Sequence, residues 1–246
     1  MSEVFLIAAV AVAAALYASV GHGGASAYLA ILTLAGRTRP EIAFTVLVMN
    51  ILVSSAAWVR FRRKGYFDAP LAGMLLVFSA PAAFAGGIIQ VSPRLFGIVL
   101  GLALLIAAAR LILPDPRPRP PLRPEGRMLW LTAALLGIGL GVLAGLTGVG
   151  GGIYLSPLLI LLGWKDTKGT AGISSAFIAI NSLTSLLGRV LRGESFNPSL
   201  LPLVAAAILG GLVGSWWGAD RAAPISLRRL LGVVLVIAGV KLLFGE

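Results

Sequence analysis

The feature that most constrains this chain is a series of apolar runs, each close to the length of a membrane-crossing helix. About 20 apolar residues are needed to cross a hydrocarbon core of roughly 30 Å. Runs of this kind follow one another with few charges between them: Phe5–Val20, Ile42–Val59, Ala69–Ile89, Leu95–Ala109, Leu129–Leu146, Ile173–Leu187, Leu200–Trp217 and Leu230–Phe244. We therefore predict an all-α, polytopic helical membrane protein.

The scarcity of charge argues against a soluble protein. Charged residues make up 12% of the 246 positions, about half of the roughly 25% that is typical of soluble domains. The formal net charge of +11 would suit nucleic acid, but the basic residues do not alternate with aromatic residues as such a surface requires, so we expect no nucleic-acid partner. The first run follows Met1-Ser2-Glu3, which lacks the basic start of a signal peptide, so we expect it to remain in the membrane.

A proline-rich segment, Pro114–Arg127, divides the chain into two halves of similar length. It holds six of the 14 prolines and four arginines, so it should be an extended, solvated connection. We predict a first transmembrane repeat at 1–113, a cytoplasmic linker at 114–127 and a second transmembrane repeat at 128–246. A PxxP docking motif is the alternative function for the linker.

The two halves resemble each other, because three pairs of motifs occur in the same order. The pairs are Gly21-His22-Gly23-Gly24 with Gly148-Val149-Gly150-Gly151, "NILVSS" from Asn50 with "NSLTSL" from Asn181, and "RLFGIVLG" from Arg94 with "RLLGVVLV" from Arg229. Any one match is weak, but their common order predicts an internal duplication.

The start of each half predicts the topology. Phe5–Gly36 contains 32 residues, which as one helix would reach about 48 Å, too long for a single crossing. A hairpin, either re-entrant or made of two short helices, returns the chain to its starting side. Each half then makes an odd number of crossings, and the two repeats are inverted. If Phe5–Val20 crosses and the next piece only dips into the bilayer, the halves are parallel instead.

The distribution of Lys and Arg predicts the orientation. In the hairpin topology one side carries 14 of the 20 cationic residues, and an excess of this kind marks the cytoplasmic side, so both termini would lie outside. That side holds Arg60–Lys64, the Arg110–Arg127 region, Lys165, Lys168, Arg221, Arg228 and Arg229, and the other holds Arg37, Arg39, Arg94, Arg189, Arg192 and Lys241.

The composition does not favour an enzyme. The chain has no cysteine, one histidine, and nine acidic residues that all fall in predicted loops or termini. Acid–base pairs, metal clusters and activated nucleophiles therefore cannot be assembled within the bilayer. We expect no catalytic residues, no metal site and no cofactor. The missing intramembrane carboxylates also disfavour a proton pump.

The two glycine clusters are the strongest candidates for a binding site. Glycine in a helix interior costs about 1 kcal/mol relative to alanine, so an adjacent group of glycines predicts a broken helix. A helix that restarts after such a break presents unpaired N–H groups and a positive dipole end, which bind anions without a charged side chain. Discontinuous helices at matching places in two repeats are typical of transporter sites. Close helix packing is the alternative, as expected for the four-residue spacing of Gly137, Gly141, Gly145 and of Gly210, Gly214, Gly218.

Polar residues near the clusters complete the candidate site. Asn50 and Ser54, like Asn181 and Ser185, are four residues apart and share a helix face. These amides bind either substrate or another helix, and His22 is either a binding or proton-linked residue or a neutral cap of the break. The candidate substrate-binding residues are Gly21, His22, Gly23, Gly24, Asn50, Ser54, Thr147, Gly148, Gly150, Gly151, Asn181 and Ser185.

These motifs resemble the TauE/SafE sulfite-exporter family. "GLTGVGGGIYLSPLLILLGW", Gly145–Trp164, is similar to that family's most recognisable stretch, and "GHGGASAYLAILTLAG", Gly21–Gly36, resembles its first-half counterpart. The resemblance implies a multi-pass transporter of small sulfur-containing anions, including sulfite and organosulfonates. Ala25 stands where the second half has Gly152, and Ala30 where it has Pro157, so the first-half site departs from the pattern.

The expected function is export of sulfite or a related organosulfonate by alternating access. A membrane potential that is negative inside drives anions outward by about 2.3 kcal/mol per charge per 100 mV. The partners would be a small anion and the lipid bilayer, with a homodimer left open. The expected location is the cell membrane, which in a Gram-negative bacterium is the inner membrane. Uptake of another small anion, an ion-coupled symporter, an anion channel and a scaffold remain the alternatives.

Overall fold

The computed structural model describes residues 2–37, 39–89, 101–102, 104–106, 108–109, 112 and 125–244. Throughout these residues the regular structure is helical, which confirms the predicted class. The first half contains α1 (Glu3–Ser19), α2 (Ala25–Leu34), α3 (Arg39–Arg63) and α4 (Ala69–Ile88). The second contains α6 (Gly126–Thr147), α7 (Gly152–Leu161), α8 (Thr167–Leu191), η1 (Pro198–Leu200), α9 (Leu201–Trp216), the π-helical turn η2 (Trp217–Arg221) and α10 (Pro224–Phe244).

Among the described helices, five segments are long and apolar enough to cross a membrane: Ile42–Arg63, Ala69–Ile88, Gly126–Thr147, Thr167–Leu191 and Pro198–Arg221. Large apolar side chains cover their outer faces, as with Leu135 (73% exposed) and Leu209 (65% exposed). Such a surface suits lipid and not water. Most of the predicted run Leu95–Ala109, of the motif from Arg94 and of the 114–127 linker lies outside the described residues.

Short polar residues start the helices at the charged end of the bundle. Asp68 accepts a hydrogen bond from the Leu71 amide at the start of α4, and Asp166 accepts one from the Gly169 amide at the start of α8. An N-cap of this kind satisfies donors that the first helical turn leaves unpaired. These caps fix where the chain re-enters the apolar layer.

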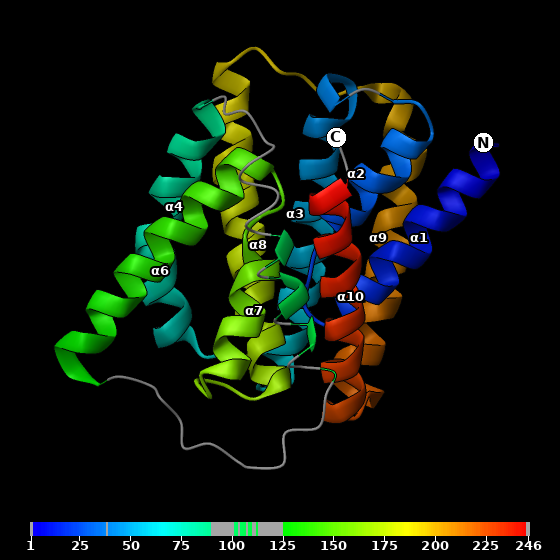
Figure 1. Cartoon of the computed structure of the whole chain (residues 1–246). Coiled ribbons are helices and arrows are strands. Elements are labelled where there is room, and N and C mark those ends of the chain that lie inside the picture. The colour runs from blue at the N-terminus through cyan, green and yellow to red at the C-terminus, as the bar shows by residue number, and fades with distance from the viewer. Residues whose placement is uncertain are drawn as a thin grey trace.

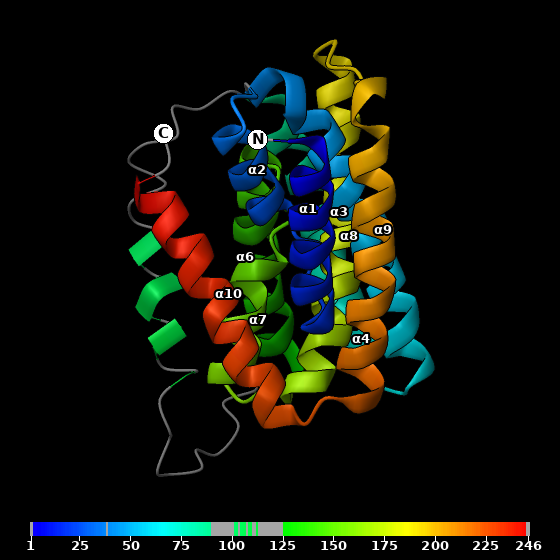
Figure 2. The same ribbon diagram turned by 90° about the vertical axis from the view of Figure 1, so that its right-hand side faces the viewer.

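The core forms where helices of one half pack on helices of the other. α4 packs against α6 and α8, α9 packs against α1 and α3, and α3 packs against α8. Figures 1 and 2 both show α1 beside α9, and α10 lies in front of the bundle in Figure 1 and at its left side in Figure 2. Each half therefore buries its apolar surface largely against the other half.

Small residues allow these helices to approach closely. A Cβ atom added to Gly137, Gly141 or Gly145 of α6 would collide with backbone atoms of α4. The same change at Gly210, Gly214 or Gly218 would collide with the backbone of α1 at Ala11, Ala15 or Ser19. The two four-residue glycine series are confirmed as packing positions.

The helix directions fit the predicted hairpin. Figure 1 shows α1 descending from the N-terminus and α2 returning toward the same end, where α3 begins. α1 and α3 descend in this view, whereas α6 and α8, their counterparts in the second half, ascend. These opposite directions are what inverted repeats require, and the inverted repeat itself stays a prediction.

Ion pairs gather charged residues at the lower end of the bundle in Figure 1. Asp220 contacts Arg60 Nε at 2.6 Å and Lys64 Nζ at 2.5 Å, and Lys165 Nζ contacts Asp68 at 2.7 Å. The prediction that all acidic residues lie in loops or termini is wrong for Glu41, in the first turn of α3. It is also wrong for Asp220, which lies in η2 within the apolar Pro198–Arg221 segment. Two cations neutralise it, which makes its place there tolerable.

Candidate functional site

The two glycine breaks meet at one side chain, Asn50 of α3. Its Oδ1 atom accepts a hydrogen bond from the Ala25 amide, directly after the first break, at 3.1 Å. Its Nδ2 atom donates to the Val149 carbonyl of the second break at 3.4 Å and to Ser182 Oγ at 2.8 Å. Asn50 is 1% exposed. The structure therefore brings together Gly21–Gly24 and Gly148–Gly151, which are more than 100 residues apart in sequence.

His22 forms a second connection between the halves. Its Nε2 atom lies 2.7 Å from Ser156 Oγ of α7, and Ser156 Oγ donates to Ser174 Oγ of α8 at 2.8 Å. Because the Ser156 hydroxyl proton is used in that bond, its oxygen is left to accept from His22 Nε2. His22 Nδ1 is buried and makes no hydrogen bond with the described part of the chain. One ring nitrogen thus remains unsatisfied beside the first break.

Asn181 is buried as well, but among the described residues it makes no hydrogen bond to either break. Its Oδ1 atom accepts a hydrogen bond from Ser79 Oγ of α4 at 3.0 Å, so the amide joins two helices, as one of the two sequence interpretations expected. Its Nδ2 atom is buried and has no hydrogen-bond partner among the described residues. Asn181 therefore supplies an unpaired donor next to α4, on the residue that corresponds to Asn50.

Three predicted hydroxyl groups serve their own helices. Ser54 Oγ donates to the Asn50 carbonyl at 2.5 Å, and Ser185 Oγ donates to the Asn181 carbonyl at 2.6 Å. Thr147 Oγ1 donates to the Leu143 carbonyl at 2.7 Å and accepts from the Val149 amide at 3.3 Å. The matching bonds of Ser54 and Ser185 agree with the duplication, but these donors are occupied.

The glycines of the breaks serve both conformation and close approach. Gly24 and Gly151, which precede α2 and α7, have φ angles of 93° and 74°, a region that L side chains rarely adopt. A Cβ atom at Gly23 would collide with Asn50 Oδ1, and one at Gly150 would lie 2.8 Å from Asn50 Nδ2. Larger residues at these positions would push α3 away from both breaks.

Several main-chain donors at the breaks are unpaired. The amides of Gly23, Gly24, Gly150 and Gly151 make no hydrogen bond to any residue that the structure describes, and all four residues are buried. A buried donor without a partner costs about 1–3 kcal/mol. Four such donors near Asn50 are the arrangement that a ligand with acceptor oxygens would satisfy.

Sequence reasoning missed five residues of this polar core. Ser182, Ser79 and Ser156 bond to predicted residues as described above, and Ser174 bonds to Ser156. Lys241 of α10 donates to the Ser26 carbonyl at 2.8 Å in the first turn of α2. Ser174 and Ser182 are two helical turns apart on α8, so the shared face was readable from their spacing. No local pattern indicates that Lys241 reaches α2.

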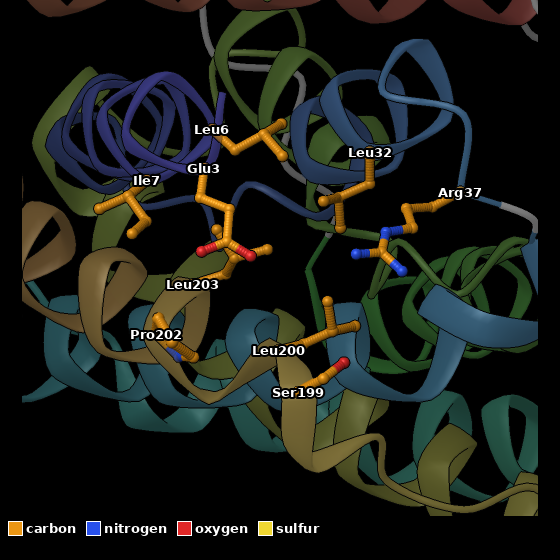
Figure 3. Close-up of a pocket in the computed structure, with 9 residues that line it drawn as sticks. All are labelled: Glu3, Leu6, Ile7, Leu32, Arg37, Ser199, Leu200, Pro202 and Leu203. Atoms are coloured by element: carbon orange, nitrogen blue, oxygen red, sulfur yellow. The ribbon is translucent and has the colours of Figure 1, made fainter. Parts of the chain in front are cut away.

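A small cavity of about 50 Å³ lies at the N-terminal end of the bundle. Figure 3 shows the Arg37 guanidinium and the Glu3 carboxylate directed into the space between α1, α2 and α9. None of the predicted site residues lines it. The lining residues are Glu3, Leu6, Ile7, Leu32, Arg37, Ser199, Leu200, Pro202 and Leu203.

Comparison with known proteins agrees with a membrane protein that transports a solute. The family model described as "Sulfite exporter TauE/SafE" matches residues 6–242. The probable membrane transporter protein y4hK of Sinorhizobium fredii is 30% identical over 237 residues, which cover 93% of this chain and 93% of that protein. No solved structure matches the chain. With a family match over nearly its whole length, the chain belongs to the TauE/SafE sulfite exporter family, a family of membrane transporters.

Proposed function

We propose that this transporter exports sulfite or a related small sulfur-containing anion, such as an organosulfonate, by alternating access. The observation that carries the proposal is the meeting of both glycine breaks at Asn50, with unpaired main-chain donors on either side. Backbone amides at the start of a helix bind oxyanions without a charged side chain. The anion would replace the missing hydrogen-bond partners.

The roles of the site residues follow from the donors that are still free. The amides of Gly23, Gly24, Gly150 and Gly151 would bind the anion's oxygens, and Asn181 Nδ2 would add a side-chain donor. His22 Nδ1 would take up a proton when the negatively charged anion occupies the site, and this would couple anion transport to proton transport. Ser54, Ser185 and Thr147 would hold the breaks in shape through their own helices.

The breaks are packed against α3 and α8, so the anion must displace contacts in order to bind. Gly150 lies against Asn50, Ser182 and Ile178, and Gly21 lies against the Ala171 backbone. Separation of α2 from α3 on one side, or of α7 from α8 on the other, would open the site to one face at a time. Two breaks joined by one amide would thus give two alternating routes to a shared site.

Sulfite counterflow in proteoliposomes tests the substrate. We expect saturable uptake of labelled sulfite that unlabelled sulfite and methanesulfonate inhibit, while chloride inhibits only weakly. Large currents without saturation would indicate a channel, and an absence of competition by every sulfur oxyanion would contradict the proposed substrate class. A lack of any flux would favour the scaffold alternative.

A pair of glycine variants tests the location of the site. We expect Gly150→Ala to abolish counterflow for two reasons. The new Cβ atom would collide with Ser182, and the alanine backbone would be strained at the φ of 76° that Gly150 adopts. Gly139→Ala in α6 is the matched control, since a Cβ atom there meets nothing within 4 Å. Both variants must elute as a single species in detergent. Equal flux in Gly150→Ala and the wild type would place the site elsewhere.

A further inference from the structure

An arginine lies beside the second break, although its sequence position suggested only a charge at the membrane surface. Arg189 is in the last turn of α8. A methyl group added to Gly148 would lie 3.1 Å from Arg189 Nη2, so the guanidinium is close to the first residue of the break. The Arg189 side chain is only 12% exposed. A cation is therefore held against the glycine cluster.

The Arg189 guanidinium uses one of its nitrogens and leaves two unused. Nη1 donates to both carboxylate oxygens of Glu194, at 3.3 and 3.1 Å. Nε is buried without a partner, and within the described residues Nη2 likewise donates no hydrogen bond. The Nε–Nη2 edge of arginine is a fork that binds two oxygens of one oxyanion at once. That edge is empty here, and its Nη2 end faces Gly148.

The local charge also favours an anion. Glu194 is shared with Arg192, whose Nη2 atom lies 3.4 Å from it, so one carboxylate serves two guanidinium groups. Arg192 differs from Arg189 in its surroundings, because its Nη1 atom donates to the Gly87 carbonyl of α4 at 3.3 Å. The cluster thus keeps an excess positive charge, and Arg189 is the member with a free edge toward the break.

From this geometry we infer that Arg189 is a substrate-binding residue of the second break, which grips two oxygens of the sulfur oxyanion through its Nε–Nη2 edge. Glu194 holds the guanidinium in place from the opposite edge. This inference rests on the proposed function and adds a charged, bidentate contact to the main-chain donors. It also predicts that oxyanions with two adjacent oxygens are preferred over chloride.

The test compares Arg189→Lys with Arg192→Lys in sulfite counterflow. Lysine keeps the charge but cannot form the planar fork. We expect Arg189→Lys to raise the KM for sulfite by about tenfold or more, since a hydrogen bond to a charged group contributes about 1.5–3 kcal/mol. Arg192→Lys should leave the KM within about twofold of the wild type. Damage to the fold alone would instead lower the maximal rate and leave the KM unchanged.

Thermal stability with added sulfite, methanesulfonate or chloride provides a readout that does not depend on transport. Binding raises the melting temperature of the protein that binds, so sulfite should stabilise the wild type and Arg192→Lys but not Arg189→Lys. If sulfite flux is present and Arg189→Lys has the wild-type KM, Arg189 is not a ligand and the proposed function stands. If no flux occurs but this stabilisation pattern holds, the exporter proposal fails and the anion site stands. If neither flux nor stabilisation occurs, both fail.

Discussion

At the residue scale, Asn50 links the two halves of the chain through both ends of its amide. Its oxygen accepts from the first half and its nitrogen donates to the second. A hydrophobic side chain of similar size would leave the Ala25 amide and Ser182 without these bonds. An amide at this position therefore determines both the spacing of the breaks and the stability of the core.

We predict that Asn50→Leu lowers the melting temperature by roughly 4–8 °C and removes sulfite counterflow. Loss of two buried hydrogen bonds costs about 2 kcal/mol, and 1 kcal/mol corresponds to about 2–4 °C for a chain of this size. Differential scanning fluorimetry in detergent measures the shift. Asn197→Leu is the control, because Asn197 is only partly buried and its side chain bonds only to Ser199, two residues away. A melting temperature equal to that of the wild type would contradict the role of Asn50.

The sequence predicted where the two helix breaks of the candidate site lie. It did not predict the hydrogen-bond partners of the polar side chains around them. Adjacent glycines mark a broken helix wherever they occur, so Gly21–Gly24 and Gly148–Gly151 stand out without a structure. The hydroxyl groups of Ser54 and Ser185 were placed on the correct helix face, yet they bond to carbonyls one turn back. A hydroxyl can bond to its own helix or to a neighbour, and only tertiary packing decides which.

At the element scale, α9 approaches α1 through a row of glycines. A side chain at Gly214 would collide with the Ala15 backbone, and backbone atoms cannot rotate away. Overpacking of this kind costs about 1–3 kcal/mol.

We predict that Gly214→Ala lowers the melting temperature, whereas Gly139→Ala, on the open face of α6, does not. Equal melting temperatures would mean that α1 and α9 separate without cost.

The π-helical turn η2 ends α9 at an ionic cluster. A π turn inserts an extra residue into a helix and occurs frequently at functional sites. Here it places Asp220 between Arg60 of α3 and Lys64, the residue directly after α3, while Lys168 Nζ donates to the Ala219 carbonyl at 3.2 Å. The second half is thereby tied to the first at this end. Buried behind the ion pairs is Ala171, packed with Ala57, Phe61 and Ala219.

We predict that Asp220→Asn loosens this end of the bundle. The chain has no cysteine, so a single Ala171→Cys substitution can report access of a soluble maleimide. If the ion pairs contribute about 1 kcal/mol, their loss makes opening of this end of the bundle roughly five times more frequent. We therefore expect maleimide to react about five times faster with Ala171→Cys/Asp220→Asn than with Ala171→Cys alone. Glu125→Gln, an exposed change at the start of α6, is the control. Identical rates with Asp220→Asn would show that the ion pairs do not hold this end closed.

The helices themselves were largely predictable, because lipid leaves few alternatives for a long apolar run. The predicted run Ala69–Ile89 appears as α4, Ala69–Ile88, and Leu200–Trp217 appears as η1 and α9. The helical position of Asp220 was not predicted, because a hydropathy pattern shows where a charge lies but not which residues neutralise it. Those partners come from the C-terminal end of α3 and the residue that follows it, far away in sequence.

At the scale of the whole molecule, the ion pairs support the grouping of charges on which the orientation was predicted. Arg60, Lys64, Lys165 and Lys168 come from different helix ends and meet around Asp68, Asp220 and the Ala219 carbonyl. Arg189 and Arg192 lie at the other end of α8. Within the part of the chain that the structure describes, these four cations thus share one end of the bundle, and the cytoplasmic assignment of that end stays a prediction.

We predict that positions 2 and 63 lie on opposite sides of the membrane. A cysteine at Ser2 should react with an impermeant maleimide in intact cells, whereas one at Arg63 should react only after permeabilisation. Both residues are exposed in the structure, so burial would not mask either label. The reverse pattern would invert the orientation, and labelling of both in intact cells would exclude the hairpin formed by α1 and α2.

The exchange of helices between halves has a consequence for how the protein is made. During synthesis, α1 and α4 leave the ribosome before α9, α6 and α8, the helices they will eventually touch. Until the last of these helices is inserted, the faces of α1 and α4 that will pack against the glycines of α9 and α6 are exposed to lipid. Assembly must therefore wait for nearly the complete polypeptide, and the newborn N-terminal portion is exposed meanwhile to membrane proteases that recognise unassembled segments.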